Sequence, residues 1–302
     1  MIYDLIIIGA GPAGLSAAIY AARQKLNFIV LTGNIGGQTN WSTEVENYLG
    51  FHLMTGAELV SKFKEHLKNY KININQNEFV NKIKKKNKSF LVFTKKTSYE
   101  AKSVIIATGK KPRHLIIPGE KELYGKGITY CATCDAPLYK NKIATIIGGG
   151  NSAVEAAMIL VKYAKKINMI VLEKKVRAEP ALLDKLKAIK KLNIITNAKT
   201  TEILGDKKVI GIKFEQNSKI KSLKTDGVFI EVGLSPNTDF CSNLVKLNKN
   251  KEIIVNTEMH SSVQGIFAAG DVNNLIEKQI IIAAGEGCVA LLQAVRYIQK
   301  LK

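Results

Sequence analysis

The chain has 302 residues, a length that suggests about two domains, and its hydrophobic content of 46% is enough to build a core in each. No apolar run approaches the roughly 20 residues that span a bilayer, so we expect no membrane segment. The formal net charge of +20 would suit a nucleic-acid partner, but only four basic residues are arginines, and lysine is the poorer residue for bidentate recognition of bases or phosphates. We therefore expect a lysine-biased surface and no nucleic-acid partner, with the densest lysine run, residues 82–88, forming a solvated hairpin.

A first nucleotide-binding turn lies at the start of the chain. Residues 2–8 form a β-branched apolar run that is typical of a buried parallel strand. Gly9, Gly11 and Gly14 follow with Gly-x-Gly-x-x-Gly spacing, and an alanine-rich helix is expected as far as Arg23. In this pattern the glycines allow a tight turn, close approach of a pyrophosphate and helix–strand packing, while the helix amino-terminus attracts the phosphates. The segment therefore predicts a dinucleotide site.

Two later strands end in residues that suit close approach of the backbone to a ligand. Residues 104–106 lead into Thr108 and Gly109, and the strand at residues 265–269 leads through Gly270 into Asp271. An aspartate at that position can accept a hydrogen bond from a ribityl hydroxyl.

A second nucleotide-binding turn repeats the first. Residues 142–147 are expected as a strand, Gly148, Gly150, Asn151 and Ser152 as the turn, and residues 154–163 as the helix. Ala153 takes the place of the third glycine, which is an accepted variant of the same packing role. Two such units indicate two dinucleotides, most simply a bound flavin and a diffusing nicotinamide coenzyme.

Cys131 and Cys134 form a Cys-x-x-Cys motif between the two turns. Zinc would need four ligands, and the other cysteines, Cys241 and Cys288, are isolated, so we expect no metal site. A lasting structural disulfide is also not expected, because the chain begins almost at once with a strand and without a signal peptide, which predicts a cytoplasmic protein. Redox exchange is the interpretation that remains.

Taken together, these motifs are similar to those of the low-molecular-weight thioredoxin reductases, and the resemblance covers essentially the whole chain. It is carried by residues 131–135, Gly36-Gly37-Gln38, residues 43–47, residues 148–153 and residues 267–271. The resemblance implies an α/β fold with two Rossmann-like, three-layer nucleotide-binding domains, the second inserted into the first. It implies an FAD domain at 1–112 and 243–302, an NAD(P)H domain at 113–242 that carries the dithiol, and a homodimer.

The resemblance also assigns roles to individual residues. Cys134 is expected to face the flavin, Cys131 to attack a partner's disulfide, and Asp135 to protonate the departing thiolate, although Asp135 could instead be a simple helix cap. A rotation of the inserted domain is expected to alternate the two half-reactions. The residues expected to contact FAD are Gly9, Gly11, Gly14, Gly37, Gln38, Asn47, Thr108, Gly109, Asp271, Gln279 and Ile280.

The nicotinamide coenzyme is expected to contact Gly148, Gly150, Asn151 and Ser152. The 2′ position of its adenosine ribose is expected to contact a second segment. Family members that use NADPH carry His-Arg-Arg and a further arginine in that segment, where this chain has Glu173, Lys174, Lys175 and Arg177.

A carboxylate suits the unphosphorylated ribose of NADH, whereas the three basic residues could still hold the phosphate of NADPH. The segment is more similar to the flavoprotein subunit of alkyl hydroperoxide reductase, an NADH enzyme, and the prediction leans to NADH. That relative carries an additional amino-terminal thioredoxin-like domain. We expect none in this chain and therefore expect a separate acceptor, thioredoxin or a thioredoxin-like protein.

Other functions fit parts of the sequence. A ferredoxin-dependent thioredoxin reductase would suit the basic surface, and an NADH-dependent reductase of a peroxiredoxin system would suit Glu173. A thiol oxidase would use the same dithiol in the opposite direction. A redox sensor without catalytic activity would have no need for two dinucleotide sites.

Overall fold

A computed structural model of the chain describes residues 2–42 and 45–301. The chain divides into two compact units, which we call unit 1 (residues 1–111 and 235–302) and unit 2 (residues 112–234). The two chain crossings, β7 (Lys110–Pro112) and β16 (Leu234–Pro236), pair with each other as a two-stranded sheet. The chain passes from unit 1 to unit 2 after residue 111 and returns to unit 1 after residue 234. The domain borders expected after residues 112 and 242 stay predictions.

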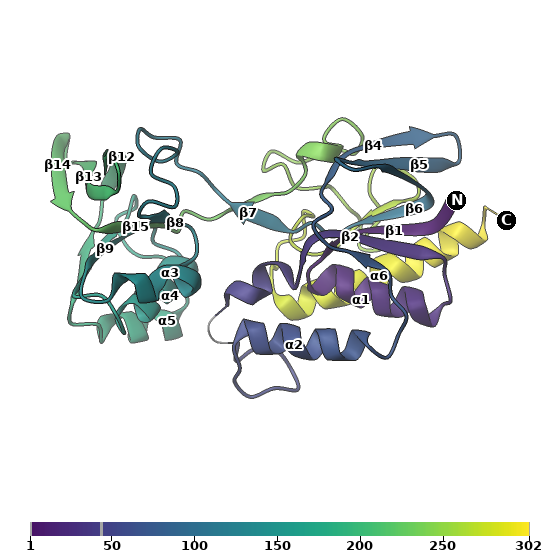
Figure 1. Cartoon of the computed structure of the whole chain (residues 1–302), viewed down its shortest axis with the longest axis horizontal. Helices are drawn as coiled ribbons and strands as arrows, with labels where there is room; N and C mark the ends of the chain where they lie inside the picture. Colours follow the sequence, from purple (N-terminus) through teal and green to yellow (C-terminus); the bar gives the residue numbers. More distant parts are fainter. Residues whose placement is uncertain (1, 43–44, 302) are drawn as a thin grey trace. The chain divides into compact units, whose positions relative to one another are not determined.

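Unit 1 is built on a sheet with the strand order β3-β2-β1-β6-β5-β4, in which β17 also pairs with β6 (Figure 1). Strand β1 is parallel to both β2 and β6, and β17 is parallel to β6, so these four strands end at the same edge of the sheet. The strands are β1 (Ile2–Ala10), β2 (Phe28–Ile35), β3 (Ile74–Asn75), β4 (Val80–Lys86), β5 (Ser89–Thr94), β6 (Ser98–Ile106) and β17 (Ile266–Ala268).

The lysine-rich run forms the expected hairpin. Strands β4 and β5 pair in antiparallel register, from Val80 opposite Thr94 to Lys86 opposite Ser89. The lysines of β4 are exposed, whereas Ile83 is buried beneath them. The hairpin thus contributes a solvated basic surface, as the interleaved lysine and asparagine residues predicted.

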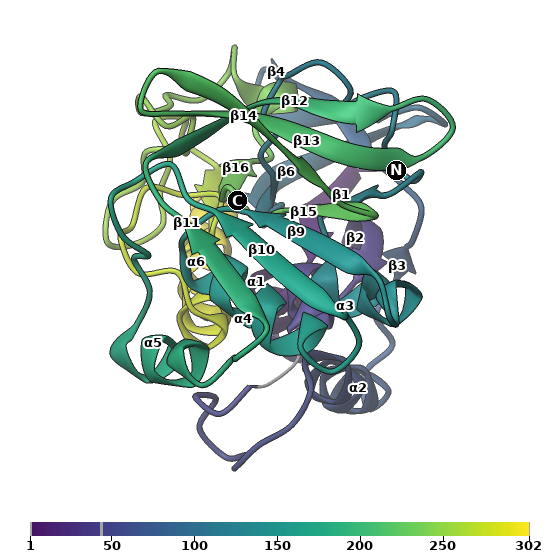
Figure 2. The same ribbon diagram turned by 90° about the vertical axis from the view of Figure 1, so that its left-hand side faces the viewer.

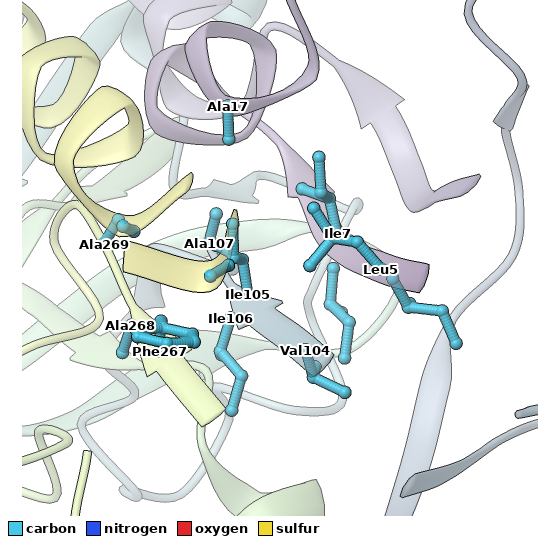
Figure 3. Close-up of a cluster of buried hydrophobic side chains, with 14 of the residues drawn as sticks. Leu5, Ile7, Ala17, Val104, Ile105, Ile106, Ala107, Phe267, Ala268 and Ala269 are labelled. Carbon is cyan, nitrogen blue, oxygen red and sulfur yellow. The ribbon is translucent and has the colours of Figure 1, made fainter. Parts of the chain in front are cut away.

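Two helices, α1 (Pro12–Arg23) and α6 (Ile280–Gln299), pack against each other and against the parallel strands of unit 1. Alanines such as Ala17 allow this close packing over the fully buried β1 and β6 side chains (Figure 3). Unit 1 also contains α2 (Gly56–Leu67) and the short 3₁₀ helices η1 (Gly37–Trp41) and η3 (Asp239–Cys241).

Helix α6 differs from the expectation that no segment could span a membrane, because its length and composition would allow it. It is, however, a core helix of unit 1 that packs on α1, β6 and β17. It buries Glu286 together with several apolar residues. Glu286, Gln293 and Arg296 interrupt the helix, so its mean hydropathy is high although it contains no long uninterrupted apolar stretch.

Unit 2 is a three-layer structure around an all-parallel sheet with the strand order β11-β10-β9-β15-β8 (Figure 2). Neighbouring β9 residues point to opposite faces: Ile146 packs with the helices, and Ile147 packs with the antiparallel sheet β12-β13-β14. The strands are β8 (Ile128–Thr129), β9 (Ile143–Ile147), β10 (Lys166–Ile170), β11 (Leu192–Ile195), β12 (Ala198–Gly205), β13 (Val209–Gln216), β14 (Lys219–Lys224) and β15 (Gly227–Ile230).

The helices of unit 2 are α3 (Ala132–Asp135), η2 (Ala136–Tyr139), α4 (Asn151–Leu160) and α5 (Pro180–Lys187). The expected fold class, α/β with two Rossmann-like nucleotide-binding folds and the second inserted into the first, is therefore confirmed. The helix expected at residues 154–163 was placed too late in the chain: α4 runs from Asn151 to Leu160, because Gly150 already serves as its N-cap.

Candidate functional site

The first glycine turn of unit 1 is closely packed at its first and third glycines and open at its second. Gly9 has φ +103°, and a Cβ on it would lie 2.2 Å from the carbonyl oxygen of Ala107. A Cβ on Gly14 would lie 1.9 Å from the carbonyl oxygen of Gly9, whereas a Cβ on Gly11 would meet nothing within 4 Å. The first and third glycines are thus required by packing, and the second leaves room for a ligand at the start of α1.

Other residues expected to contact FAD come close to one another from separate segments of unit 1, and Gly37 lies against the first turn itself. A Cβ on Gly37 would lie 3.4 Å from the Cα of Gly11, and a Cβ on Gly109 would lie 3.6 Å from Nε2 of Gln38. Asn47 Nδ2 donates to Gln279 Oε1 at 3.2 Å, with Gln279 as the N-cap of α6 and Ile280 as its first residue. Of the motif at residues 43–47, Thr43 and Glu44 lie outside the described residues.

Thr108 is already engaged by a residue that sequence reasoning missed. Its hydroxyl donates to the carbonyl of Asn237 at 2.8 Å, and Asn237 Nδ2 donates back to the carbonyl of Thr108 at 3.0 Å. The backbone N–H of Asn237 also donates to Gly109 at 3.0 Å. Thr108 and Gly109 can therefore contact a ligand mainly through their backbone, and Asn237 fixes the shape of their turn.

Asp271 follows the carboxyl end of β17, as expected, and is half-buried. Among the described residues, its carboxylate has no hydrogen-bond or ion-pair partner. Burial raises the pKa of Asp271, and the charges of Lys278 and Lys110 offset this only in part. A half-buried acceptor without a partner costs free energy unless a ligand supplies a donor, and the hydroxyls of a ribityl chain are such donors. The open Gly11 and the unpaired Asp271 are the two observations that fit a bound FAD.

The turn that carries Asp271 is held by Glu286, which the sequence prediction also missed. Glu286 is 7% exposed and accepts hydrogen bonds from the N–H of Gly270 and from Nδ2 of Asn273, both at 2.7 Å. Lys278 Nζ donates to the backbone carbonyl of Asn273 at 2.7 Å. Burial raises the pKa of Glu286 despite these bonds. Its position as a lone carboxylate in an apolar helical run was a usable signal, because buried carboxylates are almost always paired.

The predicted redox cysteines are joined in unit 2 as the disulfide Cys131–Cys134. Cys131 is the N-cap of α3 and accepts a hydrogen bond to Sγ from the N–H of Cys134 at 3.2 Å. Cys131 is half-buried, whereas Cys134 is exposed. Helix α3 packs against α4, the helix that begins at the second glycine turn. The dithiol and that turn thus belong to one compact unit.

Thr129, at the end of β8, connects Asp135 to the dithiol. Its hydroxyl donates to Asp135 Oδ2 and accepts the N–H of Cys131 at 3.1 Å. Thr129 is only 6% exposed, so the hydroxyl has little competition from water. Asp135 is the last residue of α3 and holds the N-cap position of η2, but its side chain makes no capping hydrogen bond there. The contact to Thr129 and Cys131 therefore favours the proton-transfer interpretation of Asp135 over the capping one.

The second glycine turn reproduces the packing of the first. A Cβ on Gly148 would lie 2.1 Å from the carbonyl oxygen of Glu231, whereas a Cβ on Gly150 would meet nothing within 4 Å. Gly150 is the N-cap of α4, so the free N–H groups of Asn151 and Ser152 lie in the first turn of the helix. The turn can therefore bind a pyrophosphate in the same manner as the turn of unit 1.

The segment expected to meet the 2′ position of the coenzyme is attached to this turn. Arg177 N–H donates to Gly149 at 2.7 Å, and the side chain of Asn151 exchanges two hydrogen bonds of 2.9 Å with Glu179. Asn151 therefore positions this segment, and the side-chain amide of Asn151 is already hydrogen-bonded to Glu179. The four residues expected to read the ribose are all exposed, and within the described part of the chain their side chains have no hydrogen bond or ion pair: Glu173, Lys174, Lys175 and Arg177.

Two dinucleotide turns and a disulfide in one chain define a nucleotide-dependent disulfide oxidoreductase. Comparison of sequences agrees: the chain belongs to the pyridine nucleotide-disulphide oxidoreductase family, which it matches over residues 3–287. Members of this family use a flavin together with a pyridine nucleotide, so the chain is a flavin oxidoreductase.

Known relatives are similar over nearly the whole chain. The 34.2 kDa protein in the rubredoxin operon of Clostridium pasteurianum is 42% identical over 98% of this chain and 97% of its own length. A subunit of alkyl hydroperoxide reductase from Staphylococcus epidermidis is 40% identical over 98% of this chain, which spans only 59% of that relative. Thioredoxin reductase from Lactococcus lactis has a solved structure that matches with a TM-score of 0.95 and 34% identity, covering 99% of both chains.

The contacts of Thr129 lead to a test of its role. Thr129→Val keeps the shape of the side chain but removes both hydrogen bonds, so Asp135 loses its positioning contact. We expect the reduced dithiol of this variant to react with a small disulfide roughly tenfold or more slowly, with an altered pH profile, in stopped-flow experiments. Thr129→Ser restores the hydroxyl and should react at close to the wild-type rate. An unchanged rate and pH profile in Thr129→Val would contradict this role.

Proposed function

We propose that this protein is a thioredoxin reductase-like enzyme, which passes electrons from a nicotinamide coenzyme through FAD and the Cys131–Cys134 dithiol to the disulfide of a thioredoxin-like protein. The observation that carries the proposal is the disulfide on α3, packed against the helix that begins at the coenzyme turn. The match to the Lactococcus lactis thioredoxin reductase supports the choice of acceptor. The overall reaction converts NAD(P)H, a proton and a protein disulfide into NAD(P)⁺ and a protein dithiol.

FAD would be held by the residues that the sequence predicted in unit 1. When bound, it accepts a hydride from the coenzyme and passes the electron pair to the disulfide. Gly11 leaves the backbone free for the pyrophosphate, and the unpaired carboxylate of Asp271 would accept a hydrogen bond from a ribityl hydroxyl. The amino-terminus of α6, at Gln279 and Ile280, would stabilise negative charge at the edge of the ring.

The dithiol turn is built for thiol–disulfide exchange. Once the pair is reduced, the N–H of Cys134 can stabilise a thiolate on Cys131, because it already donates to that sulfur. The Cys131 thiolate attacks one sulfur of the partner's disulfide, and Asp135, positioned by Thr129, transfers the proton of the Cys134 thiol to the departing partner thiolate. Cys134 then attacks Cys131, which re-forms the internal disulfide and releases the second partner thiol.

We further propose NADH as the preferred coenzyme. The exposed carboxylate of Glu173 can accept a hydrogen bond from the 2′-hydroxyl of the NADH ribose, and it would repel the 2′-phosphate of NADPH. Its basic neighbours Lys174, Lys175 and Arg177 would attract that phosphate, so Glu173 weakens NADPH binding without abolishing it.

A homodimer is the proposed assembly. Helix α6 exposes Ile281 and Leu292, and Tyr20 is exposed on the adjoining helix α1. A second copy covering this apolar face would remove it from water.

A second candidate function follows from the similarity to the alkyl hydroperoxide reductase of Staphylococcus epidermidis. The 40% identity and Glu173 favour an NADH-dependent reductase that serves a peroxiredoxin system. The dithiol chemistry would be the same, and the acceptor would be a separate thioredoxin-like carrier that reduces the peroxiredoxin.

Substitution of either redox cysteine tests the proposed reaction. In Cys131→Ser or Cys134→Ser, NADH should still bleach the flavin absorbance anaerobically, but reduction of oxidised thioredoxin should fall by roughly a thousandfold or more, because the exchange path is broken. Cys288→Ser is the matched control and should retain turnover. Thioredoxin reduction that survives in Cys131→Ser would contradict the proposal. No bleaching by NADH or NADPH would instead indicate ferredoxin or a thiol as the donor.

Coenzyme preference is tested by comparing kcat/KM for NADH and NADPH. The wild type should prefer NADH, and Glu173→Arg should shift the ratio toward NADPH by roughly tenfold or more, because a carboxylate is replaced by a phosphate-binding guanidinium. Glu215→Arg, an exposed change on β13, controls for the added charge and should leave the ratio unchanged. A wild-type preference for NADPH would show that the basic neighbours outweigh Glu173.

A further inference from the structure

Glu231 is a carboxylate that neither the sequence motifs nor the proposed chemistry accounts for. It follows the last residue of β15, and its N–H donates to Ile147 at 2.7 Å. Its carbonyl oxygen is the atom that excludes a side chain at Gly148. In unit 1 the corresponding place is occupied by Ala107, which precedes Thr108 and Gly109. The backbone geometry is therefore shared by the two units, but only unit 2 has a titratable side chain at this position.

The side chain of Glu231 lies over the start of the coenzyme-binding helix. A Cβ on Gly148 would lie 3.3 Å from the Cβ of Glu231, so this side chain begins beside the glycine turn. The side chain of Ser152, in the first turn of α4, and the charge of Glu155, one turn further along, both act on its pKa. Burial is the largest effect on Glu231 and, together with the like charge of Glu155, it raises its pKa to about 8. Glu231 is therefore mostly protonated at neutral pH, and it can donate a hydrogen bond as well as accept one.

Strand order places Glu231 on one particular half of the coenzyme. From β9 the chain continues to β10 and β11 on one side of the sheet, whereas β15 and β8 lie on the other side of β9. Dinucleotides bind in the crevice at such a switch point, here between β9 and β15. A bound coenzyme would place its pyrophosphate at the turn after β9 and its adenosine ribose toward the end of β10, where Glu173 is found. Its nicotinamide riboside would then extend toward the end of β15, which is where Glu231 lies.

We propose that Glu231 is a coenzyme-binding residue that recognises the nicotinamide riboside half in its protonated form and weakens binding when it ionises. This inference rests on the proposed use of a nicotinamide coenzyme. The hydroxyls of the riboside and its carboxamide are partners for a carboxylic acid that both donates and accepts. Ionisation removes the donor and adds a negative charge beside Glu155 and the coenzyme pyrophosphate. Affinity should therefore be highest below the pKa of Glu231 and decrease as the pH rises through about 8.

Calorimetric titration of the oxidised holoenzyme with NAD⁺ and with ADP, on both sides of this pKa, tests the inference. For the wild type, NAD⁺ affinity should fall roughly three- to tenfold on the alkaline side, the size expected for one lost hydrogen bond, whereas ADP, which lacks the riboside, should be much less affected. In Glu231→Gln, which keeps hydrogen bonding but cannot ionise, NAD⁺ affinity should be independent of pH over the same range. Glu215→Gln is the matched control and should behave as the wild type.

The outcomes separate the inference from the proposed function. A wild type that binds NAD⁺ with no pH dependence, or a Glu231→Gln variant that keeps the dependence, would overturn the role of Glu231 alone. Equal pH effects on ADP and NAD⁺ would also overturn it, because the carboxylate would then act only on the pyrophosphate. A holoenzyme that neither binds NAD⁺ nor is reduced by NADH or NADPH would contradict the proposed function itself.

Discussion

One close backbone contact determines the geometry of both nucleotide sites. In each unit, the first glycine of the turn lies against a carbonyl oxygen that follows the neighbouring parallel strand, Ala107 in unit 1 and Glu231 in unit 2. No side chain fits there, so the strand–turn–helix unit can form only with glycine at that position. Because this contact brings the helix start to the carboxyl edge of the sheet, the free N–H groups of the helix face the crevice where a dinucleotide binds.

What distinguishes the units is the chemistry added around the same frame. Unit 1 places Asp271 near its turn and fixes it through the buried carboxylate of Glu286, which suits a ligand that stays bound. Unit 2 instead surrounds its turn with exposed charges and adds the dithiol on the adjoining helix. An exposed, unpaired set of coenzyme contacts suits a substrate that binds and leaves. The arrangement is consistent with a tightly held flavin and an exchanging nicotinamide coenzyme.

The sequence predicted the parts of the site that depend on local rules. Gly9, Gly148 and the two cysteines were found because their spacing is set by a turn that is short along the chain. Thr129 was missed although it lies only two residues from Cys131 and six from Asp135, because the spacing of the cysteines does not specify it. Asn237, Glu231 and Glu286 were missed because each acts through a partner in a different segment, such as Asn237 with Thr108 across 129 positions. No periodicity or motif encodes such a contact, since only the folded sheet brings the two segments together. The boundary error at α4 has a smaller cause, because the last glycine of the turn caps the helix, which begins at the next residue.

The central claim is that the Cys131–Cys134 disulfide exchanges electrons with the flavin in the same protein. Anaerobic reductive titration of the purified yellow protein with dithionite, compared with a Cys131→Ser, Cys134→Ser double variant, measures this most directly. We expect the wild type to take up about twice as many electrons per flavin as the double variant, because the flavin and the disulfide each accept one electron pair. Equal electron uptake by the two proteins would show that the disulfide is not in redox contact with the flavin and would rule out electron transfer through it.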